Sequence, residues 1–88
     1  MMRCSFVVRG RVQGVGYRAF AVAAARKAGV SGWVHNAADG SVSGEAEGEP
    51  AAIEDFLTAL RRGPTFARVA SVDSTTVPAT GSAGFAVR

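Results

Sequence analysis

The chain has 88 residues, of which 48% are hydrophobic and 19% are charged, and its net charge at pH 7 is +3. The hydrophobic content excludes a disordered chain, and the length supports one core, so we expect a single domain over residues 1–88. The sequence has no apolar run long enough to cross a membrane and no N-terminal secretory signal, and we therefore expect a cytoplasmic protein.

The first part of the chain is predicted to fold as a strand followed by a helix. Residues 4–9 are rich in apolar and β-branched side chains, which predicts a central strand. Residues 18–28 are rich in alanine and predict a helix. Four side chains are spaced to form its buried face: Phe20, Ala23, Ala24 and Ala28. Gly29 follows and suits the left-handed conformation that commonly ends a helix.

The middle of the chain predicts a β-hairpin. Residues 30–37 and 41–48 are strand-like, and the Asp39-Gly40 pair between them is a strong hairpin signal. In the second strand, small or apolar residues alternate with polar ones, which predicts one packed face and one solvent-facing face. The residues expected to face solvent are Ser41, Ser43, Glu45 and Glu47.

The last part predicts a second helix and further strands. The helix has apolar residues at i, i+3, i+4 and i+7, namely Ile53, Phe56, Leu57 and Leu60. Gly63 and Pro64 end it, residues 67–77 are strand-like, and residues 85–87 alternate as a short edge strand. The order β-α-β-β-α-β is that of an α+β, ferredoxin-like fold.

The stretch from Val8 to Arg18 joins the first strand to the first helix through a glycine-rich, basic loop. Gly10, Gly14 and Gly16 can adopt positive φ angles, so successive N–H groups can converge into a concave anion site. The helix N-terminus adds further free N–H groups. The planar guanidinium of Arg18 can donate two parallel hydrogen bonds to phosphate oxygens. The residues therefore predict a pocket for a phosphate-like group.

A plain strand-to-helix turn with incidental glycines remains an equal alternative from the residues alone. The spacing fits neither the phosphate loop of nucleotide hydrolases nor the dinucleotide-binding fingerprint, and a lone glycine-rich loop is a weak signal.

Further motifs favour the pocket, because together they closely resemble the acylphosphatase family. They are the loop motif from Gly10 to Arg18, the segment Gly32-Trp33-Val34-x-Asn36, and Asp39-Gly40-x-Val42. Residues 84–88 also resemble the last strand of that family. The resemblance runs through essentially the whole chain, with the motifs in the family's order and at similar intervals.

The resemblance implies a hydrolase that converts acyl phosphates to a carboxylate and inorganic phosphate. The family needs no metal or other cofactor, and its ferredoxin-like fold packs two helices on one face of an antiparallel sheet. The partner implied is a small-molecule acyl phosphate, with no nucleic acid or membrane, and a monomer is expected.

The resemblance also implies the site. The phosphate-binding loop corresponds to Gln13, Gly14, Val15, Gly16, Tyr17 and Arg18. Arg18 matches the catalytic arginine and Asn36 matches the asparagine that positions the attacking water. A threonine commonly follows that asparagine, and Ala37 stands there in this chain. We expect the lost hydroxyl to affect the rate of hydrolysis rather than the type of reaction.

Other polar or reactive residues have simpler interpretations. His35 adjoins Asn36, so strand alternation directs it to the opposite face, and we expect it to have no catalytic role. Trp33 is interpreted as a packing residue and Asp39 as a turn residue. Cys4 is interpreted as a small, half-buried strand residue, and no spacing of Cys and His residues indicates a metal site.

Two alternatives remain open. One is a relative that acts on carbamoyl phosphate, as in hydrogenase-maturation proteins, which carry long additional domains. The other is a non-catalytic module of the same fold that binds anions or nucleic acid. Basic residues scattered along the sequence, without the interleaved aromatic residues of RNA-binding sheets, argue against nucleic acid.

Overall fold

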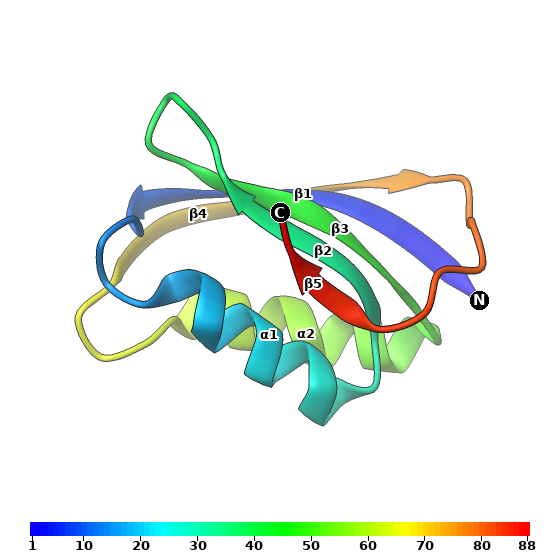
Figure 1. Ribbon diagram of the computed structural model, residues 1–88. Helices are drawn as coiled ribbons and strands as arrows, with labels where there is room; N and C mark the ends of the chain where they lie inside the picture. The colour runs from blue at the N-terminus through cyan, green and yellow to red at the C-terminus, as the bar shows by residue number, and fades with distance from the viewer.

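The computed structural model describes residues 1–88 as one five-stranded sheet with two helices on one of its faces (Figure 1). The strands are β1 (Met2–Arg11), β2 (Ser31–Asn36), β3 (Val42–Gly48), β4 (Arg68–Val77) and β5 (Phe85–Val87). The helices are α1 (Tyr17–Ala28) and α2 (Pro50–Arg62). The predicted α+β, ferredoxin-like fold and the predicted order of elements are confirmed.

The sheet is mixed, whereas the sequence predicted an antiparallel one. Its strand order is β4-β1-β3-β2-β5, and every neighbouring pair is antiparallel except β2 and β5. After β4, the chain crosses to the opposite edge of the sheet, as the orange and red segments of Figure 1 show. It therefore enters β5 in the same direction as β2 and pairs with that strand in parallel.

The core lies between the sheet and the two helices, and α2 buries the four residues that the sequence predicted. Phe56 is at its centre, with its ring centroid 5.6 Å from that of Phe6 in β1 and 5.5 Å from that of Phe85 in β5. One large side chain of α2 thus packs against a central strand and the last strand of the sheet.

The buried face of α1 differs from the prediction. Tyr17, Ala21 and Ala25 are buried, whereas Ala23 is exposed and Phe20 is half-buried. Alanines occupy so many positions of this helix that apolar periodicity does not distinguish one face from another. The large ring of Tyr17, at the first position, lies in the core. Gly29 ends the helix at φ 79°, as predicted.

Two of the four residues expected to face solvent are buried. Ser41, just before β3, is 6% exposed. Glu47, on the outer face of the sheet, is only 2% exposed. The crossover between β4 and β5 covers it. Its carboxylate accepts hydrogen bonds from the N–H groups of Thr80 at 2.7 Å and Gly81 at 2.8 Å. The sequence could not reveal this burial because these partners are more than thirty residues away.

Arg3 completes this cluster and ties it to two strands. Its guanidinium is buried and donates to Glu45 at 2.6 Å, to Glu47 at 3.2 Å and to the Ser82 hydroxyl at 3.0 Å. Buried charges of opposite sign that also satisfy their hydrogen bonds hold neighbouring segments in a fixed arrangement. The cluster therefore fastens the crossover, and with it the approach to β5, onto the sheet.

We expect this cluster to make stability depend on acidity. The Thr80 N–H, and then Arg3, hold the pKa of Glu47 below its ordinary value of 4.5. A lowered folded-state pKa contributes stability that is present above the unfolded pKa and is lost as pH falls through the folded one. Between neutral pH and about pH 3, the Tm of wild type should therefore fall more steeply than that of Glu47→Gln.

Thermal melts followed by circular dichroism at a series of pH values measure this difference. Glu54→Gln, at an exposed position of α2, is the matched control and should keep the wild-type slope. Parallel Tm profiles for wild type and Glu47→Gln would refute the assignment.

No helix of the structure is both long and apolar enough to span a membrane.

Candidate active site

The loop between β1 and α1 takes a conformation that depends on glycine. Gly14 and Gly16 have φ angles of 74° and 77°, and Gly16 is the residue that caps α1. Residues with a β-carbon rarely adopt this left-handed region. The two glycines therefore let the chain turn from the end of a central strand directly into a helix.

The N–H groups of residues 13–19 have no hydrogen-bond acceptor within the protein. The first N–H of the helix with a partner is that of Phe20, which donates to the carbonyl of Gly16 at 3.1 Å. No side chain caps the helix, and its first turn has no acidic residue. Free N–H groups at a helix N-terminus carry partial positive charge, so this loop has the chemistry of an anion site.

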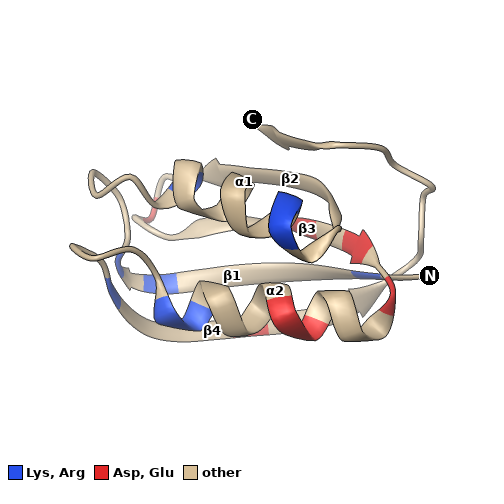
Figure 2. Ribbon diagram, turned by 90° about the horizontal axis from the view of Figure 1, so that it is seen from below, with Lys and Arg blue, Asp and Glu red and all other residues tan.

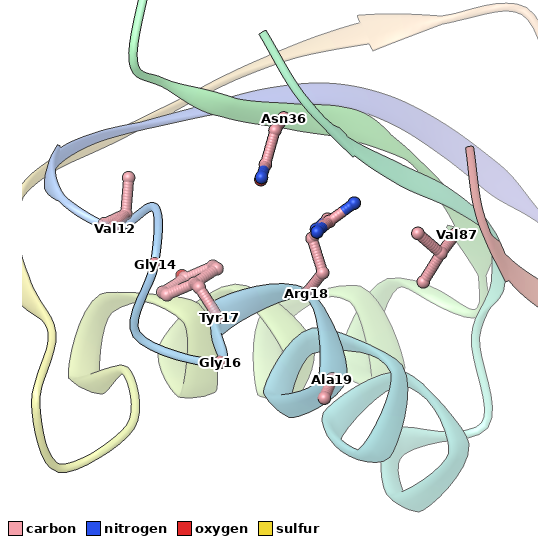
Figure 3. Close-up of a pocket in the computed structure, with 8 residues that line it drawn as sticks. All are labelled: Val12, Gly14, Gly16, Tyr17, Arg18, Ala19, Asn36 and Val87. Atoms are coloured by element: carbon pink, nitrogen blue, oxygen red, sulfur yellow. The ribbon is translucent and has the colours of Figure 1, made fainter.

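Arg18 and Asn36 share a pocket of about 360 Å³ with this loop. It is lined by Val12, Gly14, Gly16, Tyr17, Arg18, Ala19, Asn36 and Val87. Figure 3 shows the amide of Asn36, at the end of β2, pointing down into the pocket, with the loop on one side of it and the guanidinium of Arg18 on the other. Neither side chain hydrogen-bonds to another protein group, so both are free to contact a ligand.

The match to known proteins decides the family. The family model described as acylphosphatase matches residues 4–87, nearly the entire chain. The chain belongs to the acylphosphatase family.

Individual relatives and solved structures support the same family assignment. An acylphosphatase of Anaeromyxobacter sp. (strain Fw109-5) is 53% identical over 72 residues, covering 82% of this chain and 77% of that relative. The crystal structure of an acylphosphatase from Bacillus subtilis superposes with a TM-score of 0.96 at 36% identity, over 100% of this chain and 99% of that one. Full-length HypF, in its phosphate- and nucleotide-bound form, superposes with a TM-score of 0.92 at 26% identity, over 99% of this chain but 12% of that chain.

Not every predicted loop residue of this acylphosphatase-family chain lines the pocket. Val15 packs against the core and Gln13 turns away, so neither side chain contributes to the lining. Tyr17 does line it, but its hydroxyl donates to the carbonyl of Leu60 in α2 at 2.6 Å, and burial raises the pKa of the phenol. Tyr17 thus anchors the start of α1 rather than offering a proton.

The amide of Gln13 connects the two halves of the pocket. Its Nε2 donates to the carbonyl of Ala37 at 2.8 Å and to that of Ser41 at 2.9 Å. Ala37 directly follows Asn36, and its own N–H donates to the same Ser41 carbonyl at 2.8 Å. Gln13 therefore fixes the backbone beside Asn36 relative to the loop. The sequence motif indicated that Gln13 belonged to the loop, but it gave no signal of these bonds.

We expect Gln13→Met, which keeps the length of the side chain and removes both donors, to lower kcat by roughly tenfold to a hundredfold through misplacement of Asn36. Inhibition by inorganic phosphate should change little, because the loop N–H groups remain. Steady-state kinetics with an acyl phosphate and phosphate as inhibitor measures both quantities. An unchanged kcat in a folded Gln13→Met protein would show that the bonds do not position Asn36.

Several basic residues that are scattered in the sequence lie together at the loop end of the molecule. Arg11 and Arg68 are paired across β1 and β4, and Arg61 and Arg62 end α2. Figure 2 shows most Lys and Arg segments at this end, apart from those in the last turn of α1 and near the N-terminus, and most Asp and Glu segments toward the other end. A field of one sign around a pocket raises the local concentration of oppositely charged ligands. This arrangement favours anions near the loop.

The remaining candidates have structural partners outside the pocket. His35 lies on the outer face of the sheet, where it hydrogen-bonds the Ser43 hydroxyl at 2.8 Å and meets the ring of Trp33 edge-on. The carboxylate of Asp39 accepts bonds from the hydroxyl and N–H of Ser41, which lower its pKa. Cys4 is buried rather than half-buried, and burial raises the pKa of its thiol. No group of three or more His, Cys, Asp or Glu side chains is arranged to hold a metal ion.

Proposed function

We propose that this chain hydrolyses acyl phosphates to a carboxylate and inorganic phosphate, with its own N–H groups and Arg18 neutralising the phosphoryl oxygens in place of a metal ion. Hydrolysis of acyl phosphates follows from membership of the acylphosphatase family. The observation that carries the site assignment is that the unpaired N–H groups of the loop, Arg18 and Asn36 border a single pocket.

The reaction makes modest demands on the protein, because an acyl phosphate already carries a carboxylate as leaving group. Water attacks phosphorus, the bond from phosphorus to the bridging oxygen breaks, and the carboxylate leaves with the electron pair. The catalytic task is to stabilise charge on the phosphoryl oxygens and to hold water in line. Preorganised N–H donors and the planar fork of Arg18 supply the first of these.

Asn36 performs the second task, which is to hold the attacking water in line. Its amide carries both a donor and an acceptor, so it can orient water, but it does not take up a proton at neutral pH. Its contribution to the rate is positional, through the entropy saved by holding the nucleophile. The proton released by the attacking water passes to the phosphate itself, since Tyr17 stays protonated and the pocket lining holds no carboxylate or histidine.

The test is hydrolysis of benzoyl phosphate by wild type and Asn36→Ala, each with and without EDTA. We expect turnover by wild type to be unaffected by EDTA, and kcat of Asn36→Ala to fall by about tenfold to a hundredfold with little change in KM. His35→Ala is the matched control, because it alters the adjacent residue on the opposite face and should retain most activity.

Three outcomes would contradict this assignment. Loss of activity in EDTA with recovery on adding a divalent cation would refute a metal-free mechanism. Equal losses in Asn36→Ala and His35→Ala would refute a specific role for Asn36. A wild type that binds phosphate without turning over any acyl phosphate would favour a non-catalytic anion-binding module.

A further inference from the structure

The pocket has an apolar wall on the side away from the phosphate loop. Val87, in β5, lines it and is 50% exposed, and Ala19, in the first turn of α1, lines it as well. In Figure 3, Val87 lies on the far side of Arg18 from Gly14 and Gly16. Of the large apolar side chains that are exposed, namely Met1, Phe66 and Val87, only Val87 borders the pocket.

This wall is held firmly despite the shortness of β5. Val87 is the parallel-strand partner of Val34 in β2, and the N–H of the next residue, Arg88, donates to the Val34 carbonyl at 2.8 Å. At the other end of β5, the ring of Phe85 packs on Phe56 in the core. Val87 is therefore fixed by the sheet and the core, and it offers a preformed apolar surface.

The charges around this wall are distributed unevenly. Arg18 is the only charged residue that lines the pocket. In the proposed reaction its guanidinium binds the phosphoryl group, so it is not available to a second anion. Arg88 does not supply a second cation, because its guanidinium lies over the ring of Trp33, 4.9 Å from the centroid, on the outer face of the sheet. A negative group that lay against Val87 would lose part of its hydration without gaining a cationic partner.

The size of the pocket leaves space for an acyl group. Its volume of about 360 Å³ is within the range of small-molecule sites, which runs from roughly 300 to 1,000 Å³. With the phosphoryl group against the loop N–H groups, the rest of a substrate extends past Arg18 toward Val87.

We propose that Val87 and Ala19 form a subsite for the acyl group, which favours acyl phosphates with an apolar acyl group over those whose acyl group carries a second negative charge. This inference rests on the proposed hydrolysis of acyl phosphates. Apolar contact with a half-exposed side chain discriminates modestly, so the effect should lie in substrate affinity, with the chemical step unchanged.

The experiment compares kcat/KM for benzoyl, acetyl and succinyl phosphates. Wild type should prefer benzoyl over succinyl phosphate by at least about tenfold. Val87→Thr keeps the branched shape of the side chain and makes it polar, and it should lower the benzoyl-to-acetyl ratio of kcat/KM by about threefold to tenfold, through KM. Val87→Ile, which extends the apolar surface, should keep or raise that ratio.

Ala86→Thr is the matched control, because Ala86 lies next to Val87 in β5 but pairs with Trp33, whose side chain is on the outer face. It should keep the wild-type ratio. A wild type that hydrolyses succinyl phosphate as well as benzoyl phosphate would overturn the inference, as would ratios unchanged in both Val87 variants. A wild type inactive on all three substrates would overturn the proposed function itself, and with it the subsite.

Discussion

Replacement of Arg18 by alanine is expected to lower kcat/KM for acyl phosphates by about a hundredfold to a thousandfold, the usual loss when a preorganised donor to a transition-state oxyanion is removed. Arg18 is the only charged residue in the pocket, so no neighbour can replace it. Steady-state kinetics with benzoyl phosphate measures the loss, and circular dichroism establishes that the variant is folded.

The matched control for this variant is Arg26→Ala, an exposed arginine in the last turn of the same helix. It removes the same charge from α1 without touching the pocket, so it should retain nearly full activity. Arg18→Lys should recover only part of the loss, because an ammonium group does not reproduce the planar two-pronged contact. A folded Arg18→Ala protein with the activity of Arg26→Ala would contradict the role assigned to Arg18.

Replacement of Phe56 by alanine is expected to lower the free energy of unfolding by about 3–5 kcal/mol. Phe56 is fully buried, and its ring packs on both Phe6 and Phe85, so truncation leaves a cavity between α2 and the sheet. Urea denaturation followed by circular dichroism measures the change. A loss of this size is a large fraction of the stability of a small domain.

Phe66→Ala is the control for Phe56→Ala, because the Phe66 ring is 79% exposed in the turn before β4. Its removal should change the free energy of unfolding by no more than about 0.5 kcal/mol. Equal effects of the two substitutions would contradict the central place of Phe56 in the core.

The two helices show why part of the fold could be predicted and part could not. In α2, large apolar residues recur with helical spacing among polar ones, so the buried face was predictable. In α1, alanines occur on several faces, and the burial of Tyr17, Ala21 and Ala25 depends on how the helix docks. The fifth strand was predicted from its alternation, but its parallel pairing with β2 depends on the path of the crossover, for which the sequence has no local signal.

The candidate site was likewise predictable in part. Arg18 and Asn36 were identified by family resemblance, and the structure brings both to one pocket with the predicted loop glycines. The bonds from Gln13 to the hairpin carbonyls and the apolar wall at Val87 were not predicted. Both depend on contacts between residues far apart in the sequence, which no local pattern encodes.

The central claim is that water held by Asn36 attacks phosphorus while the loop and Arg18 hold the phosphoryl oxygens. Hydrolysis of benzoyl phosphate in water labelled with heavy oxygen tests it most directly, with both products analysed by mass spectrometry. The account predicts that the enzyme places the label in inorganic phosphate and leaves benzoate unlabelled. Label in benzoate, above that from the uncatalysed reaction, would mean attack at the carbonyl carbon and would contradict the roles given to Arg18 and Asn36.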